Sequence, residues 1–287
     1  MNHRVLTIAA ITGSACLNAH AAASRLLVSE VVVAPTQAEM VAIYNPNPYV
    51  VDLSNYYLAD YESYYNLVVS VAPASSDFVV RFPAGARISS KQTQFIAVGG
   101  AECFKSACGV VGPFSGFGVY PTFEIPSSTT ANNSADVPDM LSPFGGAIGS
   151  THGLTNAGEP VTLFYWDGAT NLVTDVDYVF AGTPSVSQPA VNKTGVTING
   201  SEYLPDTVDT TAQHAPLTAT GNIETCRVHP YTEGAQIASG GNGVGGADET
   251  SEDSANTWSA CASLATVPVA TVSDILFADG FEPFTPD

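Results

Sequence analysis

The sequence predicts an all-β protein of one domain, and three observations support this. Short apolar runs are present, the first of them rich in branched residues, as suits a pleated, largely buried strand. Clusters of Gly, Pro, Asn and Ser separate these runs, in a chain of 287 residues that holds 25 Gly and 19 Pro. No convincing helical stripe interrupts the pattern between residues 25 and 263. Because sandwiches with extended loops reach this length, we expect a single domain over residues 25–263.

The first strands are predicted within residues 26–60. Residues 27–32 alternate along a branched run, with Leu27 and Val31 expected on one face and Val28 and Val32 on the other. Residues 40–44 predict a second strand, which Asn-Pro-Asn-Pro at 45–48 ends because proline lacks a backbone donor. Residues 51–53 and 56–58 continue the series as further strands.

The order of these segments resembles the opening of a lamin-tail domain, in the branch found on secreted bacterial proteins. The resemblance begins with Tyr-Asn-Pro at 44–46 and Val-Asp-Leu-Ser-x-Tyr-Tyr-Leu-x-Asp at 51–60. Similar segments follow at residues 81–86, 95–98, 153–159, 163–168, 175–178 and 240–258. The resemblance implies an immunoglobulin-like β-sandwich with long loop insertions that acts as an interaction module. Relatives commonly carry a glutamate where this chain has Ala42, so a partner bound at that glutamate is not expected here.

The N-terminal residues 1–23 predict a secretory signal peptide. A short basic head is followed at residues 5–16 by an apolar stretch too short to span a bilayer, and residues 19–23 offer small-x-small cleavage sites. Gly13 stands where a lipoprotein signal would need an aliphatic residue before Cys16. We therefore expect a secreted protein, located outside the cell, on its surface or in the periplasm, without a membrane span.

Cysteine usage agrees with export. Four cysteines follow the signal peptide: Cys103, Cys108, Cys226 and Cys261. An even number in an oxidising compartment favours disulfides, and three pairings are possible. We favour Cys103 with Cys108, which are close in sequence, and Cys226 with Cys261, which would join the last two strands. A zinc site is disfavoured because no Cys-x-x-Cys pair is present.

Charge argues against nucleic acid as a partner. The chain carries 8 basic and 27 acidic residues, a formal net charge of −19 at neutral pH. Phosphate binding depends on clustered Lys and Arg, whereas Lys91, Lys105 and Lys193 are isolated in sequence. Strong acidity is also the ordinary condition of a soluble exported protein.

Two segments stand apart from the sandwich. Residues 99–153 form a long excursion whose aromatic residues should pack back on the domain, because exposed aromatics would favour aggregation. Residues 264–287 read as a linker and a C-terminal tail that resembles a Phe-x-Asp-Gly-Phe-Glu peptide recurring on exported proteins of some Gram-negative bacteria. The tail is either a loose terminal peptide or a recognition tag that docks by strand addition.

Catalytic frames are missing from the sequence. The three histidines after the signal peptide, His152, His214 and His229, lie outside any His-Glu-x-x-His frame, and no Gly-x-Ser-x-Gly elbow is present. His152, in a glycine-rich loop, is the strongest single candidate, although a surface histidine is the simpler interpretation. The tyrosines at 56, 57, 64 and 65 would either line a sugar-binding surface or fill the core. We favour the core and predict that the protein is not an enzyme.

One acidic segment is a candidate calcium site. Asp248, Glu249, Glu252 and Asp253 lie within six residues after a glycine-rich stretch, with hydroxyl residues between them. Such a set offers the oxygen ligands that calcium prefers if the loop folds back. The alternative is a solvated acidic hairpin, and no other cofactor is predicted.

The sequence thus favours a non-catalytic secreted module that binds a protein, a glycan or a surface component. Two alternatives remain. One is an extracellular hydrolase whose site is assembled from loops, which only the 99–153 excursion motivates. The other is a calcium-dependent structural protein of a surface layer or matrix.

Overall fold

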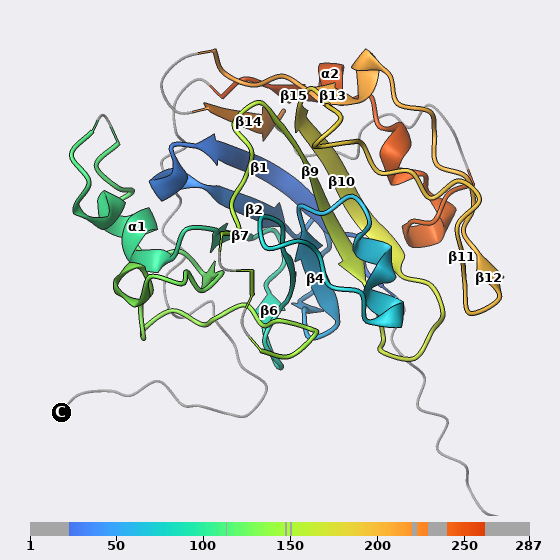
Figure 1. Cartoon of the computed structure of the whole chain (residues 1–287), viewed down its shortest axis with the longest axis horizontal. Helices are drawn as coiled ribbons and strands as arrows, with labels where there is room; N and C mark the ends of the chain where they lie inside the picture. The colour runs from blue at the N-terminus through green and yellow to red at the C-terminus, as the bar shows by residue number, and fades with distance from the viewer. Residues whose placement is uncertain are drawn as a thin grey trace, which may run out of the picture.

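The protein is an all-β sandwich, described by a computed structural model over residues 23–112, 114–146, 148–149, 151–219, 223–228 and 240–261. Two sheets pack face to face, one of six strands and one of five (Figure 1). The predicted all-β fold is therefore confirmed. Residues 1–22 of the predicted signal peptide, the segment 264–287 and His229 lie outside the described residues.

The strands are as follows. The six-stranded sheet has the order β15 (Trp258–Ser259), β14 (Ile223–Arg227), β1 (Leu27–Ala34), β2 (Met40–Tyr44), β7 (Thr93–Ala97) and β8 (Phe123–Glu124). The five-stranded sheet has the order β13 (His214–Ala215), β10 (Thr174–Gly182), β9 (Gly158–Tyr165), β4 (Tyr56–Ala59) and β5 (Val79–Arg81). Two small ribbons pair β3 (Val51–Asp52) with β6 (Arg87–Ile88) and β11 (Thr197–Ile198) with β12 (Ser201–Glu202).

A bulge in β1 changes the predicted alternation of side chains. The register between β1 and β2 shifts between Val28 and Glu30. An extra residue in one strand reverses the face of the side chains that follow it. Val28 and Val31 therefore both enter the core between the sheets, whereas Val32 packs on the opposite face. The prediction that Val28 and Val32 share a face was wrong for this reason.

Three apolar clusters hold the fold together. The largest fills the space between the two sheets and includes Phe78, Phe82 and Phe123. A second covers the outer face of the five-stranded sheet and is rich in aromatic side chains. The third covers the outer face of the six-stranded sheet, where Ala42 lies fully buried. Since both sheets are covered on both faces, the strands read as apolar runs rather than as strict alternations.

The excursion at 99–153 packs against the sandwich as predicted. It contains the helix α1 (Ala101–Ser106), which lies beside β2 and β7 at the left of Figure 1. Phe104 and Phe114 from this segment are buried against β2 and β7 in the third cluster. The short strand β8 extends the sheet by parallel pairing with β7. Much of the aromatic content of the excursion is thus part of the core.

The remaining helices are short. The described helices besides α1 are α2 (Ser254–Thr257) and the 3₁₀ turns η1 (Thr36–Ala38), η2 (Tyr64–Val69), η3 (Ala107–Gly109), η4 (Thr130–Asn132), η5 (Thr211–Gln213), η6 (Val244–Gly246) and η7 (Glu249–Ser251). Within the described ranges, none of them has the length and apolar character needed to cross a bilayer.

Both favoured disulfides are present. Cys103 in α1 is bonded to Cys108, and Cys226 in β14 is bonded to Cys261, just after β15. The second bond joins the last two described strands of the six-stranded sheet, which pair through only a short ladder at Cys226 and Arg227. The cysteines of the chain that follow the predicted signal are therefore all oxidised in this structure.

Candidate functional site

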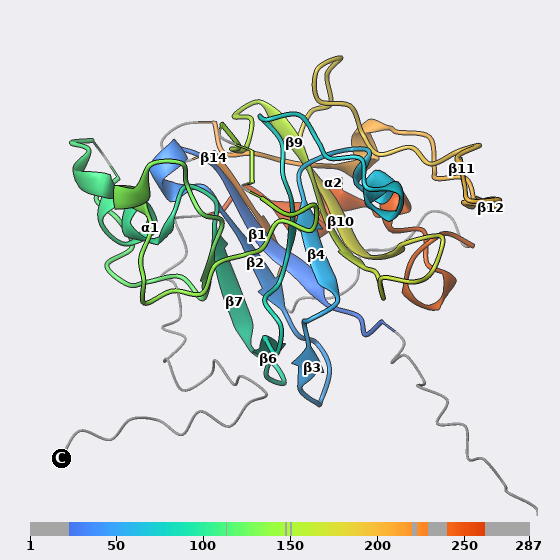
Figure 2. The same cartoon turned by 60° about the horizontal axis from the view of Figure 1, so that its bottom comes forward.

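A polar groove lies at one end of the five-stranded sheet. Its walls are the loop between β9 and β10, the hairpin β11–β12 with the residues after it, and the glycine-rich turn before η6. The cavity measures about 540 Å³. Figure 2 shows the β11–β12 hairpin at the right edge of the molecule.

The side chains of the groove are mostly hydrogen-bonding groups. The carboxylates come from Asp167 and Glu202, the amides from Asn171 and Asn242, and the tyrosine rings from Tyr165 and Tyr203. Asn171 and Glu202 are exposed, whereas Tyr203 is buried and its hydroxyl accepts a hydrogen bond from the Val173 backbone N–H at 2.9 Å. No lysine or arginine lines the described groove, so it favours neutral or cationic ligands over anions.

Local sequence explains the rigidity of the groove. Asp167 accepts hydrogen bonds from the backbone N–H groups of Ala169 and Thr170, at 2.9 and 2.8 Å, which closes the turn after β9. Asn242 clamps the opposite wall, because its side chain exchanges two 2.8 Å hydrogen bonds with the backbone of Leu204. The walls are thus preformed.

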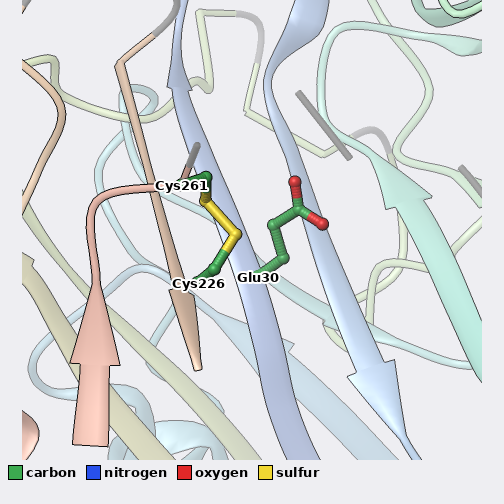
Figure 3. Close-up of side chains that lie close together, drawn as sticks. All are labelled: Glu30, Cys226 and Cys261. Carbon is green, nitrogen blue, oxygen red and sulfur yellow. A yellow bond between two sulfur atoms is a disulfide. The ribbon is translucent and has the colours of Figure 1, made fainter. Parts of the chain in front are cut away.

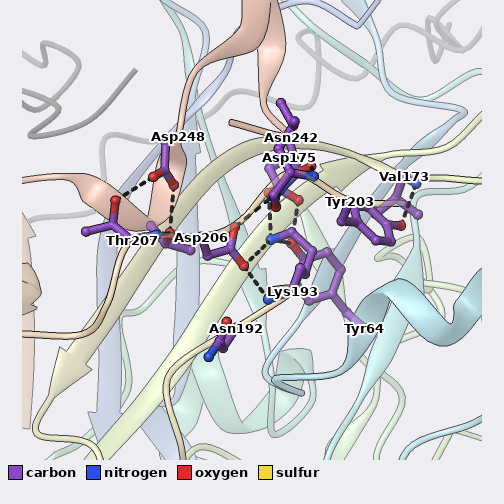
Figure 4. A network of polar contacts seen from close by, with 12 residues as sticks. Tyr64, Val173, Asp175, Asn192, Lys193, Tyr203, Asp206, Thr207, Asn242 and Asp248 are labelled. Carbon is purple, nitrogen blue, oxygen red and sulfur yellow. Dashed lines mark hydrogen bonds and ion pairs between the residues drawn. The ribbon is translucent and has the colours of Figure 1, made fainter. Parts of the chain in front are cut away.

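Beneath the groove lies a buried ionic cluster, which we call the Lys193 cluster: Lys193, Asp175, Asp206 and Tyr64 (Figure 4). The Lys193 ammonium lies 2.9 Å from Asp175 and 3.0 Å from Asp206, and donates to the Tyr64 hydroxyl at 3.2 Å. Tyr64 donates in turn to Asp175. The Lys193 side chain is fully buried, which is rare for lysine even when it is paired.

The Lys193 cluster adjoins the groove through Asn242. The Asn242 amide donates to Asp206 at 3.3 Å and also lines the cavity. Burial raises the pKa of Asp206, and the nearby Asp175 carboxylate adds to this against the opposing effect of Lys193. Burial also raises the pKa of Tyr64 well above its ordinary value, so its hydroxyl keeps its proton. For Lys193, burial lowers the pKa, but the two carboxylates outweigh it and the net shift is upward.

The candidate calcium residues are not gathered around one point. Asp248 accepts hydrogen bonds from the hydroxyls of Thr207 and Thr250, at 2.6 and 2.7 Å. Asp253 accepts instead from the Asn256 amide at 2.8 Å. Glu249 and Glu252 approach each other together with Asp177 of β10, so only two of the four predicted residues come together.

Arg227 supplies a cation to two of those three carboxylates, Asp177 and Glu252. Its guanidinium contacts both Asp177 oxygens, at 2.8 and 2.6 Å, and reaches Glu252 at 3.2 Å. The acidic segment is also buried rather than solvated, with Glu249 and Glu252 each 1% exposed. A protein cation thus already balances carboxylates of this region, where a calcium ion was the candidate.

A second group of potential metal ligands contains two cysteines that are oxidised to a disulfide. Glu30 lies close to Cys226 and Cys261 (Figure 3). Because both sulfur atoms are joined in a disulfide, neither offers the thiolate that metal ions bind. The arrangement is therefore structural.

The histidine candidates do not form a described catalytic group. The ring nitrogens of His152 lie 2.5 Å from the Gly149 carbonyl and 3.1 Å from the Val98 carbonyl, so the ring joins two backbone segments. His152 lines a smaller cavity of about 310 Å³ beside the Cys103–Cys108 disulfide. His214 is paired with Asp209 at 2.9 Å. Within the described ranges, no hydrogen bond joins either ring to a hydroxyl nucleophile.

The four tyrosines considered for sugar binding are core residues. Tyr56, Tyr57, Tyr64 and Tyr65 are between 1% and 8% exposed. Tyr57 stacks on Phe164 with ring centres 5.2 Å apart, and Tyr56 donates to the Ser24 carbonyl at 2.9 Å. The interpretation of these rings as core is confirmed, and the tyrosines of the groove are others.

Comparison with known proteins finds a distant structural neighbour. No family model and no curated protein matches the chain. A DUF4876 family protein from Bacteroides thetaiotaomicron matches with a TM-score of 0.39 and 15% identity, over 57% of this chain and 55% of that one. The chain thus spans about half the length of that neighbour, and the likeness is too low to carry an argument about function.

Sequence reasoning missed the Lys193 cluster and the groove. Lys193 looks like an isolated charge in the sequence, because its partners Asp206 and Tyr64 lie 13 and 129 residues away. No short motif marks such an assembly. The scarcity of basic residues could have pointed to this cluster, because Lys193 is the single lysine or arginine between Lys105 and Arg227.

Proposed function

We propose that the protein is an exported, lamin-tail-like interaction module, without catalytic activity, that binds a neutral glycan in the polar groove. The observation that carries the proposal is the groove itself: a preformed cavity of about 540 Å³ lined by carboxylates, amides and tyrosine. Disulfides persist in oxidising compartments, which supports an extracellular or periplasmic location.

The chemistry of the groove suits sugar hydroxyls. Carboxylate oxygens accept hydrogen bonds, and amide side chains both donate and accept, so together they match vicinal hydroxyl groups. Tyr165 contributes an aromatic edge for the apolar side of a sugar ring. The acidic wall and the net charge of −19 disfavour polyanions such as nucleic acid.

The test is binding of the folded protein to an array of neutral oligosaccharides, followed by calorimetry with the best ligand. The double variant Asn171→Ala/Glu202→Ala removes two exposed groove side chains and should keep the fold. We expect it to weaken binding by at least about tenfold, the effect of losing roughly 1.4 kcal/mol.

The matched control is Asp136→Ala, which removes one exposed carboxylate from the 99–153 excursion. It should bind as the wild type does. Retention of no neutral oligosaccharide by the wild type, or equal affinity of the double variant, would contradict the proposal. Turnover of a bound oligosaccharide would instead favour the hydrolase alternative.

A further inference from the structure

We propose that Lys193 and Asp175 join in an intramolecular isopeptide bond, with Asp206 relaying the protons. The amide would link the Lys193 Nζ atom to the Asp175 side-chain carbon. It would form within the folded chain, with no enzyme and no co-reactant. This activity is independent of ligand binding in the groove.

The three reacting groups are already in contact. The Lys193 nitrogen lies 2.9 Å from an Asp175 oxygen and 3.0 Å from an Asp206 oxygen. The reacting carbon is bonded directly to that Asp175 oxygen, and reactants held so close together have effective molarities far above those reached in solution. Here strand β10 holds Asp175, while Asp206 lies in the segment after β12.

Burial favours the neutral product. The side chains of Lys193, Asp175 and Asp206 are 0%, 3% and 2% exposed. Charged groups removed from water carry a large desolvation penalty, which an uncharged amide does not. The aromatic cluster on the outer face of the five-stranded sheet includes Tyr64 and Tyr203, so aromatic rings flank the site.

Asp206 is placed to relay protons. Its oxygens accept hydrogen bonds from the Lys193 backbone N–H at 2.6 Å and from the Asn242 amide at 3.3 Å, which fixes the carboxylate beside the ammonium. Burial raises the pKa of Asp206, so it accepts a proton more readily than an exposed aspartate does.

Tyr64 is placed to activate the acceptor. Its hydroxyl donates to the Asp175 oxygen that does not contact Lys193. A donor at this oxygen stabilises the negative charge that develops when an amine attacks the carboxyl carbon. Since the pKa of Tyr64 is raised by burial, the donor stays protonated.

The step balances without oxidation or reduction. One proton moves from the Lys193 ammonium to Asp206, against the net upward shift of the Lys193 pKa, and the neutral amine attacks the Asp175 carbon. A second proton leaves the nitrogen through Asp206. One Asp175 oxygen departs with both protons as water, a carbon–oxygen bond is exchanged for a carbon–nitrogen bond, and the charges of the ion pair cancel.

The sequence offers a direct test by tryptic mapping of the reduced, denatured protein. The basic residues in this region are Lys105, Lys193 and Arg227. An unmodified chain yields the fragments 106–193 and 194–227. Because trypsin does not cleave after an amidated lysine, the isopeptide form should yield one fragment, 106–227, lighter than its sequence by the mass of one water.

Variants identify the acceptor. Lys193→Arg should show the full mass, and Asp206→Asn should remove most of the cross-link by disabling the relay. Asp175→Asn should lose ammonia in place of water, because the leaving group is then the amide nitrogen. Loss of ammonia from Asp206→Asn instead would overturn the assignment of Asp175.

The wild-type result alone decides the proposal, even if a variant fails to fold. Fragments 106–193 and 194–227 at full mass would overturn it. Loss of water with cleavage still occurring at Lys193 would also overturn it, since that pattern indicates a succinimide at an aspartate.

Discussion

Arg227 joins the two sheets through a single side chain. It belongs to β14 of the six-stranded sheet, yet its guanidinium binds Asp177 of β10 in the five-stranded sheet. Its Nε atom also donates to the Val28 carbonyl at 2.8 Å, and the group lies over the Trp258 ring at 4.9 Å. The planar guanidinium carries several N–H donors in a fixed geometry, so one arginine can bind a carboxylate, a backbone carbonyl and an aromatic ring at once.

We predict that Arg227→Met lowers the free energy of unfolding by about 3–5 kcal/mol, because Asp177 and Glu252 then remain buried without their cation. Urea unfolding at neutral pH measures this change. The control is Arg87→Met in the β3–β6 ribbon, where the side chain is half-buried, and it should cost much less. Equal losses for the two variants would contradict the role assigned to Arg227.

Glu39 is a buried carboxyl group whose pKa lies close to neutral pH. Burial raises its pKa to about 7, although the Leu154 backbone N–H donates to it at 2.9 Å. Below the ordinary pKa of 4.5 the group is protonated whether or not the chain is folded. Its burial then does not lower the free energy of unfolding through a buried charge. As pH rises through 7, the folded state must carry a buried charge and loses stability.

We predict that Glu39→Gln stabilises the protein at about pH 8 by about 1–3 kcal/mol, and that the gain falls to a small fraction of this near pH 5. The amide oxygen can still accept from Leu154, while the charge is removed. Thermal unfolding at both pH values measures the difference. Glu202→Gln, at an exposed site, is the control and should change little at either pH. A gain for Glu39→Gln that does not depend on pH would refute this account.

At the scale of elements, the two disulfides differ in the length of chain that they close. Cys226 and Cys261 are 35 residues apart, whereas Cys103 and Cys108 are 5 apart. A cross-link restricts the unfolded chain more when its loop is longer. The shorter loop lies in the 99–153 excursion, and the longer one joins strands of the main sheet.

Replacing both Cys226 and Cys261 by serine should therefore cost about 4 kcal/mol, against about 2 kcal/mol for the pair Cys103 and Cys108. Chemical unfolding of the two double variants, each compared with wild type, gives the ranking. A reversed order would show that strain or residual structure, and not loop length, sets the contribution of these bonds.

Sequence pattern predicted elements better than it predicted the contacts between them. The strand at 40–44, the end at Asn45-Pro46, and both disulfide pairs follow from local residue types and spacing. The faces on which the β1 side chains lie could not be predicted in this way, because a bulge depends on pairing with the facing strand. The burial of Glu252 and Lys193 was not predicted either. Each charge is balanced by a residue outside its own local segment, Arg227 for Glu252 and Asp206 for Lys193.

At the scale of the whole molecule, several other buried carboxyl groups lower the stability of the folded state as pH rises, as Glu39 does. Burial raises the pKa of Glu124, Glu159 and Glu224 to about 7 as well. Each contributes most to stability when protonated, below its ordinary pKa of 4.5. That contribution is lost as pH rises through 7.

We predict that the Tm of the wild type falls by several degrees between about pH 5 and about pH 8. Differential scanning calorimetry at constant ionic strength measures it. Repulsion among surface charges acts in the same direction, but salt screens it, whereas buried groups are screened much less. Part of the fall should therefore persist in high salt. A Tm that is flat or rises with pH would contradict this prediction.

The position of the Cys226–Cys261 disulfide also decides how the sheet resists a pull. β15 pairs with β14 through Trp258 and Ser259, a ladder short enough to peel away one bond at a time. A force applied to the chain beyond Cys261 does not have to pass through this ladder, because the disulfide carries it directly to β14. There it acts on a strand that pairs with β1 from Ile223 to Cys226, a longer ladder than the one to β15.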